Sequence, residues 1–407
     1  MKKIIKEMLG VLLVTSAMGL SSCGLFDCNH KVEDSSCEKC GFQSYSDCLE
    51  FTLNNNEYSV SAIDGFSAKS TIIPSEYEGI KVTSIKDGGF RQCKTLEKIG
   101  LPEGLEVIGR EAFYYCPLVE ITIPSTVEEI KSYAFWGAKL KSIYIPAKVT
   151  SLGDNIVAVN KEMESIVVDS NNPKYDSRNN CNAIIVTETN ILKSACATTV
   201  IPEGVVELEM NAFSNIPLIE NLYIPASLVG YIGSFPGCNI NNIVVDSNNP
   251  KYDSRDNCNA IIETAKNELL KGSNNTVIPN SVTSIAYGSF RNCKSLKTIA
   301  IPEGIKYIYH DTFVNCEALE EITLPSTLEH LGASSFLKCK SLKTIVIPGN
   351  VKRMEREVFK GCESLTIYCE AEAASAEWDS TWNVDNRPVY WASQWEYDGE
   401  GNPTPKN

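Results

Sequence analysis

Four residues near the start of the chain have the side chains and the spacing of a metal site. Cys28, His30, Cys37 and Cys40 form a C-x-H-x6-C-x2-C pattern that is followed by glycine. Three thiolates and one imidazole can complete the tetrahedron that Zn²⁺ prefers, and four protein ligands leave no open position for catalysis. A disulfide in a flexible stalk would also account for the cysteines. The cluster therefore indicates either a structural zinc ion or a disulfide, and no other cofactor is expected.

An acidic, amide-rich block occurs twice in the chain. The segment VVDSNNPKYDSRNNCNAII, residues 167–185, returns at 244–262 with Asn179 replaced by Asp256 as the only change. Oxygen-bearing side chains at this density invite a calcium interpretation. A calcium-binding EF-hand loop requires an oxygen ligand at its fifth position and glycine at its sixth. Pro173 and Lys174 stand there instead, so the block does not match that loop.

The position of the block within the chain favours a structural role. Each copy follows an apolar strand, and Val167 and Val244 each lie 35 residues before a proline, Pro202 or Pro279. Asn-Asn-Pro is typical of a turn. We therefore predict a long rung in which a hairpin replaces the usual short turn. Two such hairpins would project from the array as a paired contact surface.

The elements that must position these groups follow a repeat of 22 or 23 residues. Prolines mark the repeat, and a phenylalanine usually follows eleven residues later. The prolines are Pro102, Pro124, Pro146, Pro202, Pro225, Pro279, Pro302, Pro325 and Pro348, and the phenylalanines are Phe113, Phe135, Phe213, Phe290, Phe313, Phe336 and Phe359. A fixed period in this range with LxxIxIP strands is typical of a leucine-rich-repeat solenoid.

Each repeat predicts a short strand that ends at the proline, which lacks the N–H for a further ladder bond. A short helical piece would then carry the phenylalanine inward, and stacking would bury what a single unit cannot. The predicted fold is an α/β, parallel-sheet-bearing solenoid of about ten rungs over residues 81–369. Cys293, Cys316, Cys339 and Cys362 recur every 23 residues, so we interpret them as small buried residues and not as disulfides.

The repeated unit IPxxVxxIxxxAFxxCxxLxxIxIP resembles the BspA-like leucine-rich-repeat family of bacterial surface proteins, over roughly residues 45–397. The resemblance implies adhesion at the cell surface and binding of host or neighbouring-cell proteins. It names no ligand, because ligands differ among members of a family that shares a fold.

The two ends of the chain predict export and capping. Residues 1–22 read as a signal peptide, and LSSC resembles a lipobox that would acylate Cys23 and anchor the chain to the outer membrane, with the cell surface as the expected side. Residues 23–44 would form a stalk and 45–80 an N-terminal β cap. The tryptophan-rich segment 370–397 reads as a lid on the last rung or as a sugar-binding platform, and 398–407 as a disordered tail.

The chemistry of the surface favours binding over catalysis. A formal charge of −14 argues against nucleic acid as a partner, and no arrangement typical of an enzyme occurs. The outward positions of the strands are the expected binding face, with Tyr144, Tyr223, Thr122 and Asn221 as its candidates. Ser380, in Asp-Ser-Thr, is a candidate glycosylation site.

The function predicted first is recognition of a protein or glycan at the cell surface. The alternatives are an envelope-organising lipoprotein without an external ligand and a glycan-binding lipoprotein. The sequence does not give the oligomeric state.

Overall fold

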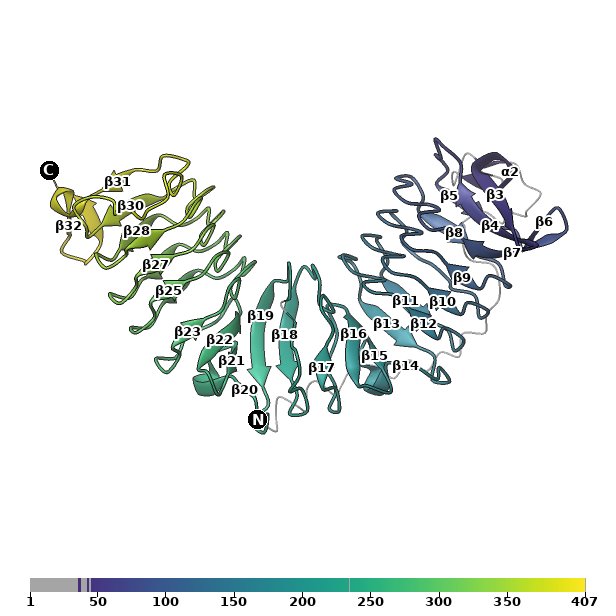
Figure 1. Ribbon diagram of the computed structural model, residues 1–407, viewed down its shortest axis with the longest axis horizontal. Helices are drawn as coiled ribbons and strands as arrows, with labels where there is room; N and C mark the ends of the chain where they lie inside the picture. Colours follow the sequence, from purple (N-terminus) through teal and green to yellow (C-terminus); the bar gives the residue numbers. More distant parts are fainter. Residues whose placement is uncertain (1–35, 38–41, 44, 234, 407) are drawn as a thin grey trace.

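The computed structural model describes residues 36–37, 42–43, 45–233 and 235–406. The chain forms a solenoid of stacked coils that bends into an arch, with a cap at each end (Figure 1). Across the described part of the chain, no helix has the length and the apolar character needed to cross a membrane. Cys23, Cys28, His30 and Cys40 lie outside the described residues, and the predictions about them stay predictions.

One row of strands runs along the arch, and we call its members the first strands. They pair in parallel with the next rung, so equivalent positions of successive repeats lie side by side. Apolar alternation turns Ile143 and Ile145 into the core and leaves Tyr144 outside. The first strands are β5 (Ser70–Ile72), β8 (Lys98–Gly100), β11 (Ser142–Ile145), β13 (Ser165–Val168), β18 (Ile219–Ile224), β19 (Ile240–Val245), β24 (Thr298–Ala300), β26 (Glu321–Thr323), β28 (Thr344–Ile347), β30 (Thr366–Cys369) and β31 (Val389–Tyr390).

A second row of strands follows the proline turns; all have two residues except β7, and we call them the second strands. Leu105, Val127 and similar residues of the VxxI pattern point inward from this side. The second strands are β7 (Ile80–Ile85), β9 (Val107–Ile108), β10 (Glu129–Ile130), β12 (Ser151–Leu152), β17 (Glu207–Leu208), β23 (Ser284–Ile285), β25 (Tyr307–Ile308), β27 (His330–Leu331) and β29 (Arg353–Met354).

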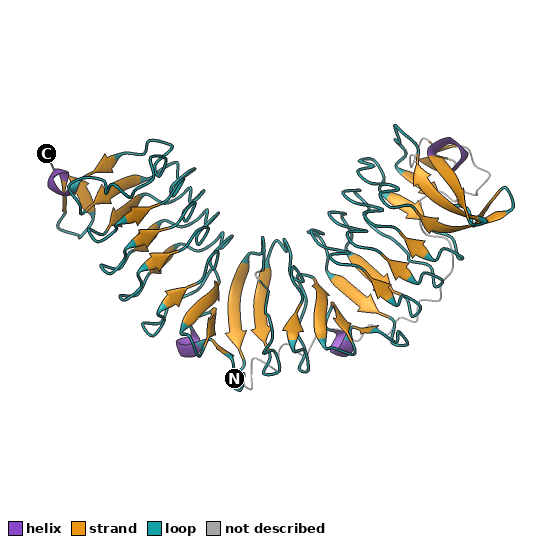
Figure 2. Cartoon of the chain, viewed as in Figure 1, coloured by secondary structure: helices purple, strands orange, loops and turns teal. Residues whose placement is uncertain are grey.

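The phenylalanine segments are turns, and the helical piece predicted there is wrong. The residues two before and two after the phenylalanine have positive φ, as at Glu111 (55°) and Tyr115 (53°) around Phe113. Left-handed residues on both sides cannot continue a right-handed helix. The turns instead bond to the next rung, where Phe113 N–H donates to Ala134 O at 2.7 Å. Figure 2 shows how little of the chain is helical.

The turns stack into an apolar ladder inside the solenoid. Successive phenylalanine rings lie 5.0–5.6 Å apart in the runs Phe90–Phe113–Phe135 and Phe290–Phe313–Phe336–Phe359. Beside them the repeat cysteines are buried and free, as predicted from their phase. The thiols of Cys316, Cys339 and Cys362 donate to phenylalanine carbonyls, as from Cys316 to Phe290 O at 3.2 Å.

The duplicated blocks form the predicted hairpins, but these are built into the wall and do not project from it. In the first block β14 (Tyr175–Asp176), β15 (Ala183–Val186) and β16 (Ile191–Ala195) join β17 in one sheet. In the second block β20 (Tyr252–Asp253), β21 (Ala260–Glu263) and β22 (Glu268–Gly272) join β23 in the same way. The prediction of a projecting contact surface is therefore wrong.

Each hairpin divides the core. Ile184 packs in the N-terminal part of the core, whereas its neighbour Ile185 packs in the central part. Ile261 and Ile262 likewise face the central and the C-terminal parts. A strand buried on both faces reads as a continuous apolar run, which explains the Ala-Ile-Ile of both copies.

The hairpins also explain the arch. Each one adds strands to the second-strand side, and strands are spaced about 4.8 Å apart, so this side becomes the longer one. The 3₁₀ turns of the two blocks, Arg178–Asn180 and Arg255–Asn257, lie on the outer side of the bend (Figure 2).

The ends are closed by different means. At the N-terminal end α2 (Tyr45–Cys48), β3 (Leu49–Asn54), β4 (Glu57–Ala62) and β6 (Glu76–Tyr77) cover the first rungs, and β1 (Ser36–Cys37) pairs with β2 (Phe42–Gln43). Phe51 stacks on Tyr77 at 4.1 Å within this cap. At the C-terminal end β32 (Trp395–Tyr397) pairs with β33 (Pro403–Pro405). The structure thus places an ordered strand in the tail, 398–407, where the sequence predicts disorder.

Tryptophans cover the last rung with their indole N–H groups turned inward. Trp378 Nε1 donates to Val351 O at 3.1 Å, and Trp395 Nε1 donates to Cys369 O at 2.9 Å. Trp382 meets Phe359 edge to face, at the end of the phenylalanine ladder. These contacts belong to a lid, and they leave the buried rings of Trp378 and Trp395 little surface to offer a sugar.

Candidate functional site

Two tyrosines stand on the outward side of the first strands, where the sequence predicts the binding face. Tyr144 on β11 is 49% exposed, and Tyr223 on β18 is 38% exposed. Each lies beside an exposed valine of the next rung, Val167 or Val244, because the strands pair in register. We call Tyr144, Val167 and Asp169 the first tyrosine patch, and Tyr223, Val244 and Asp246 the second.

The aspartates of the duplicated blocks hold the tyrosines in place. The Tyr144 hydroxyl donates to Asp169 Oδ2 at 2.5 Å, and the Tyr223 hydroxyl donates to Asp246. Asp169 Oδ1 also accepts from the backbone N–H of Asn171 at 2.8 Å. Burial and the neighbouring carboxylate raise the pKa of Tyr144 to about 12, while the hydroxyl lowers the pKa of Asp169. The phenol therefore stays protonated at neutral pH and remains the donor.

The other polar residues of the duplicated block build its turns. Asp176 binds Arg178 through both oxygens, at 2.7 and 2.6 Å, and Asp253 binds Arg255 in the same way. Asn172 caps the preceding rung by donating to Pro146 O and Val149 O, both at 2.9 Å. In sequence the block resembled a repeated metal site because its turns are held by Asp and Asn side chains. The same side chains supply oxygen ligands to metal ions.

The four candidates of the binding face do not converge on one cavity. Thr122 is exposed on a segment that forms no strand in the described structure. Asn221 precedes Tyr223 on β18 and accepts from Asn242 at 3.2 Å. What the structure brings together is instead each tyrosine with a valine and an aspartate. Val167 and Val244 were missed because the sequence search for outward positions stopped at the strands that end in proline.

The other predicted site residues are placed only in part. Cys37 ends β1, and no cluster of three metal-ligating side chains occurs among the residues that the structure describes. Ser380 is exposed in a turn in which Thr381 donates to Asp379 from both its N–H and its hydroxyl. The glycosylation of Ser380 stays a prediction.

The stacked parallel strands, the proline-marked turns and the buried phenylalanine ladder define a leucine-rich-repeat solenoid. The family model described as the BspA-type leucine-rich-repeat region matches six copies, over residues 83–195, 188–261 and 268–375. These ranges span more than half of the chain, and the chain belongs to this family. The resemblance of its repeated unit to the BspA-like family is therefore confirmed.

Solved structures of bacterial repeat proteins are similar in fold. A leucine-rich-repeat protein from Eubacterium ventriosum is 18% identical, with a TM-score of 0.45, over 78% of this chain and 93% of that one. The pneumococcal vaccine antigen PcpA is 18% identical, with a TM-score of 0.45, over 82% of this chain and 86% of its own. A leucine-rich cell surface protein from Faecalibacterium prausnitzii is 19% identical, with a TM-score of 0.37, over 83% and 95%. No curated protein matches the sequence.

Proposed function

We propose that this chain is an exported, non-catalytic protein that is anchored by acylation of Cys23 and binds another protein at the cell surface through its two tyrosine patches. The observation that carries the proposal is the pair of patches themselves. Each presents an aromatic ring and an aliphatic side chain to solvent, and the aspartate has already fixed the ring. A rigid tyrosine loses little conformational entropy when it is buried at an interface, and tyrosine is common among the residues that dominate binding.

The repetition of the patch supports a partner with an extended surface. Both patches face outward from first strands, so one partner can contact both. Once one patch is bound, the high effective concentration of the partner favours binding at the other. Membership of the BspA-type family supports recognition and not catalysis. The sequence of residues 1–23, with its basic start and its apolar run before LSSC, supports export and lipid anchoring.

Binding is tested with the full chain and its variants Tyr144→Ala, Tyr223→Ala and the double variant. Binding to host cells and to a panel of matrix proteins should fall about tenfold or more with each single change, because exposed aromatic anchors are worth more than 1 kcal/mol. Thr298→Ala, at an outward position of β24, is the matched control and should bind normally. Unchanged binding by the double variant would contradict the proposal, and the absence of any partner would favour the envelope-organising alternative.

Anchoring is tested separately. Cells that express the chain are labelled with a palmitate analogue, and Cys23→Ser should abolish the label while Cys28→Ser keeps it. Protease added to intact cells should degrade a surface-exposed chain. Protection from protease would place the chain on the periplasmic side instead.

A further inference from the structure

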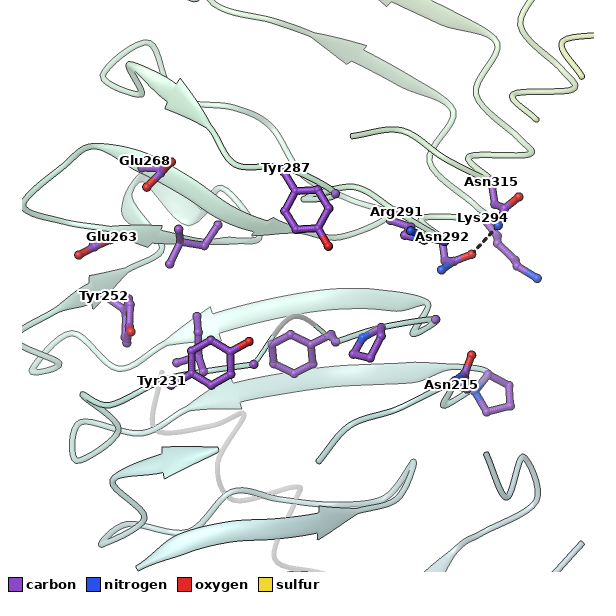
Figure 3. Close-up of a pocket in the computed structure, with 18 of the residues that line it drawn as sticks. Asn215, Tyr231, Tyr252, Glu263, Glu268, Tyr287, Arg291, Asn292, Lys294 and Asn315 are labelled. Carbon is purple, nitrogen blue, oxygen red and sulfur yellow. Dashed lines mark hydrogen bonds between the residues drawn. The ribbon is translucent and has the colours of Figure 1, made fainter. Parts of the chain in front are cut away.

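At each duplicated block the turn of the preceding rung lies near the turn of the following rung, and these two equivalent junctions differ in the space they enclose. At the first junction, the pocket between the turns at residues 155–163 and 211–217 has a volume of only about 10 Å³. At the second, between residues 231–237 and 287–294, a cleft of about 1020 Å³ opens (Figure 3). We call this the second-junction cleft. Its size is at the upper end of what ligand sites require.

Two features of the sequence open the second junction. Val167 follows Pro146 by 21 residues, whereas Val244 follows Pro225 by only 19, so the rung before the second block is shorter. At the first junction Lys193 crosses the space and contacts Asp154 at 3.0 Å and Glu209 at 3.0 Å. The positions 77 residues after Lys193 and Glu209 hold Leu270 and Ala286, so no ion pair crosses there.

The walls of the cleft carry aromatic side chains. Tyr231 and Tyr287 face each other across it, and they are 47% and 56% exposed (Figure 3). The residue equivalent to Tyr287 at the first junction is Met210. Two aromatic faces on opposite walls can hold a flat molecule with apolar faces, such as a pyranose ring, whose axial C–H groups pack against aromatic carbon.

One end of the cleft is polar and cationic. Arg291 and Lys294 lie there with the amides of Asn215 and Asn292, and the equivalents of Arg291 and Lys294 at the first junction are Ser214 and Pro217. One guanidinium nitrogen of Arg291 forms an ion pair with Asp311 at 3.1 Å, and Lys294 Nζ lies 4.0 Å from Glu317 Oε1. The cleft gathers five cationic and two anionic side chains in a chain whose net charge is −14. An anionic ligand is therefore favoured locally.

The polar side chains of the cleft suit a sugar. Its lining includes amide, guanidinium and phenol groups, which can bond to the hydroxyls of a sugar. The two turns bond to neighbouring rungs on the sides that face away from the cleft, where Asn215 N–H donates to Pro236 O and Asn292 N–H donates to Val314 O.

We propose that the second-junction cleft binds an acidic oligosaccharide, with sugar rings between Tyr231 and Tyr287 and a carboxylate or sulfate group at Arg291 and Lys294. This site is independent of the tyrosine patches and of where the protein resides.

The test is calorimetric titration of the full chain with three hexamers: α-1,4-galacturonate, the neutral sugar maltohexaose, and hexaglutamate. Galacturonate should bind at least about tenfold more tightly than either of the others, and more weakly as NaCl is raised, because salt screens the charged contacts. Tyr287→Ala and Arg291→Ser should each weaken binding by about tenfold.

Met210→Ala is the matched control, because Met210 occupies the equivalent position at the first junction and is 66% exposed. It should leave binding unchanged, and circular dichroism should show that all variants are folded. Equal binding of maltohexaose would overturn the assignment of an acidic ligand, and equal binding of hexaglutamate would overturn the assignment of a sugar. No saturable binding of galacturonate, or the same loss in Met210→Ala, would overturn the site.

Discussion

The first and second duplicated blocks are nearly identical in sequence and backbone, yet the junction at the first block is closed and the junction at the second is open. In both blocks the hairpin, the Asp–Arg turn and the aspartate that holds a tyrosine recur. Even the one substitution within the blocks, Asn179 to Asp256, falls on a residue with φ of 57° in both copies. The difference between the junctions therefore comes from residues outside the identical segment.

The two copies agree in the buried strand of the hairpin and differ at the hairpin edge that faces the turns. The strand that divides the core has no room for change, since Ala183, Ile184 and Ile185 are fully buried, as are Ala260, Ile261 and Ile262. The edge of the hairpin that faces the turns is less buried and can carry different side chains. In the first copy Lys193 forms an ion pair with Glu209 there, and in the second copy Leu270 lies in the same cleft as two exposed tyrosines.

The largest effect should come from the shared part. Ile184→Ala and Ile261→Ala each remove a fully buried side chain from a dividing strand, and each should lower the free energy of unfolding by about 2–5 kcal/mol. Denaturant unfolding measures both. Because the packing is equivalent, the two losses should agree within about 1 kcal/mol. A large loss at one site and a negligible loss at the other would show that the blocks are not equivalent in structure.

The shared part was predictable from sequence, and the reason is periodicity. The phases of proline, phenylalanine and cysteine give the rung, and an extra run of apolar and turn residues gives the hairpin. The turns around the phenylalanines were assigned as helical because spacing alone does not report backbone conformation. Gly88, Asn211 and Gly288, each two residues before a phenylalanine, carried the signal for positive φ.

The cleft and the tyrosine patches were not predictable in the same way. Tyr144 meets Asp169 only because β11 and β13 pair in register, and a single sequence does not give that register. The cleft depends on a rung shortened by two residues and on side chains such as Tyr231 and Tyr287, which lie 56 positions apart in the chain. Such differences look like ordinary variation between repeats until the rungs are stacked.

An intermediate effect should come from the charged bridge of the first junction. Lys193 is only 10% exposed, and Lys193→Met leaves the half-buried Glu209 without its cation. The free energy of unfolding should fall by about 1–3 kcal/mol. Leu270→Met, the same change at the equivalent position, should cost less than about 1.5 kcal/mol because volume and polarity are kept. A smaller loss for Lys193→Met than for Leu270→Met would contradict a stabilising bridge.

The bridge also predicts a pH dependence. Burial alone would lower the pKa of Lys193, but its bonds to Glu209 and Asp154 raise that pKa above the ordinary value of 10.5. A raised pKa in the folded state gives stability that is complete below pH 10.5 and is lost as the pH rises through the folded value. Wild type should therefore lose more stability than Lys193→Met between pH 10 and 12. Parallel curves for the two proteins would show that the bond contributes nothing.

The smallest effect on stability should come from moving the bridge to the second junction. Leu270→Lys with Ala286→Glu places the pair at two partly exposed positions, of which Leu270 lines the cleft, so the free energy of unfolding should change by less than about 1 kcal/mol. Binding of galacturonate should nevertheless fall about tenfold, because the longer lysine side chain at position 270 takes up space in the cleft. The reverse exchange, Lys193→Leu with Glu209→Ala, should create no binding at the first junction. Met210 and Ser214 supply neither an aromatic wall nor a cation there, and the longer preceding rung still fills the gap. If the reverse exchange produced binding, the bridge alone would separate the two junctions; if it does not, the aromatic and cationic residues of the second junction are what make it a site.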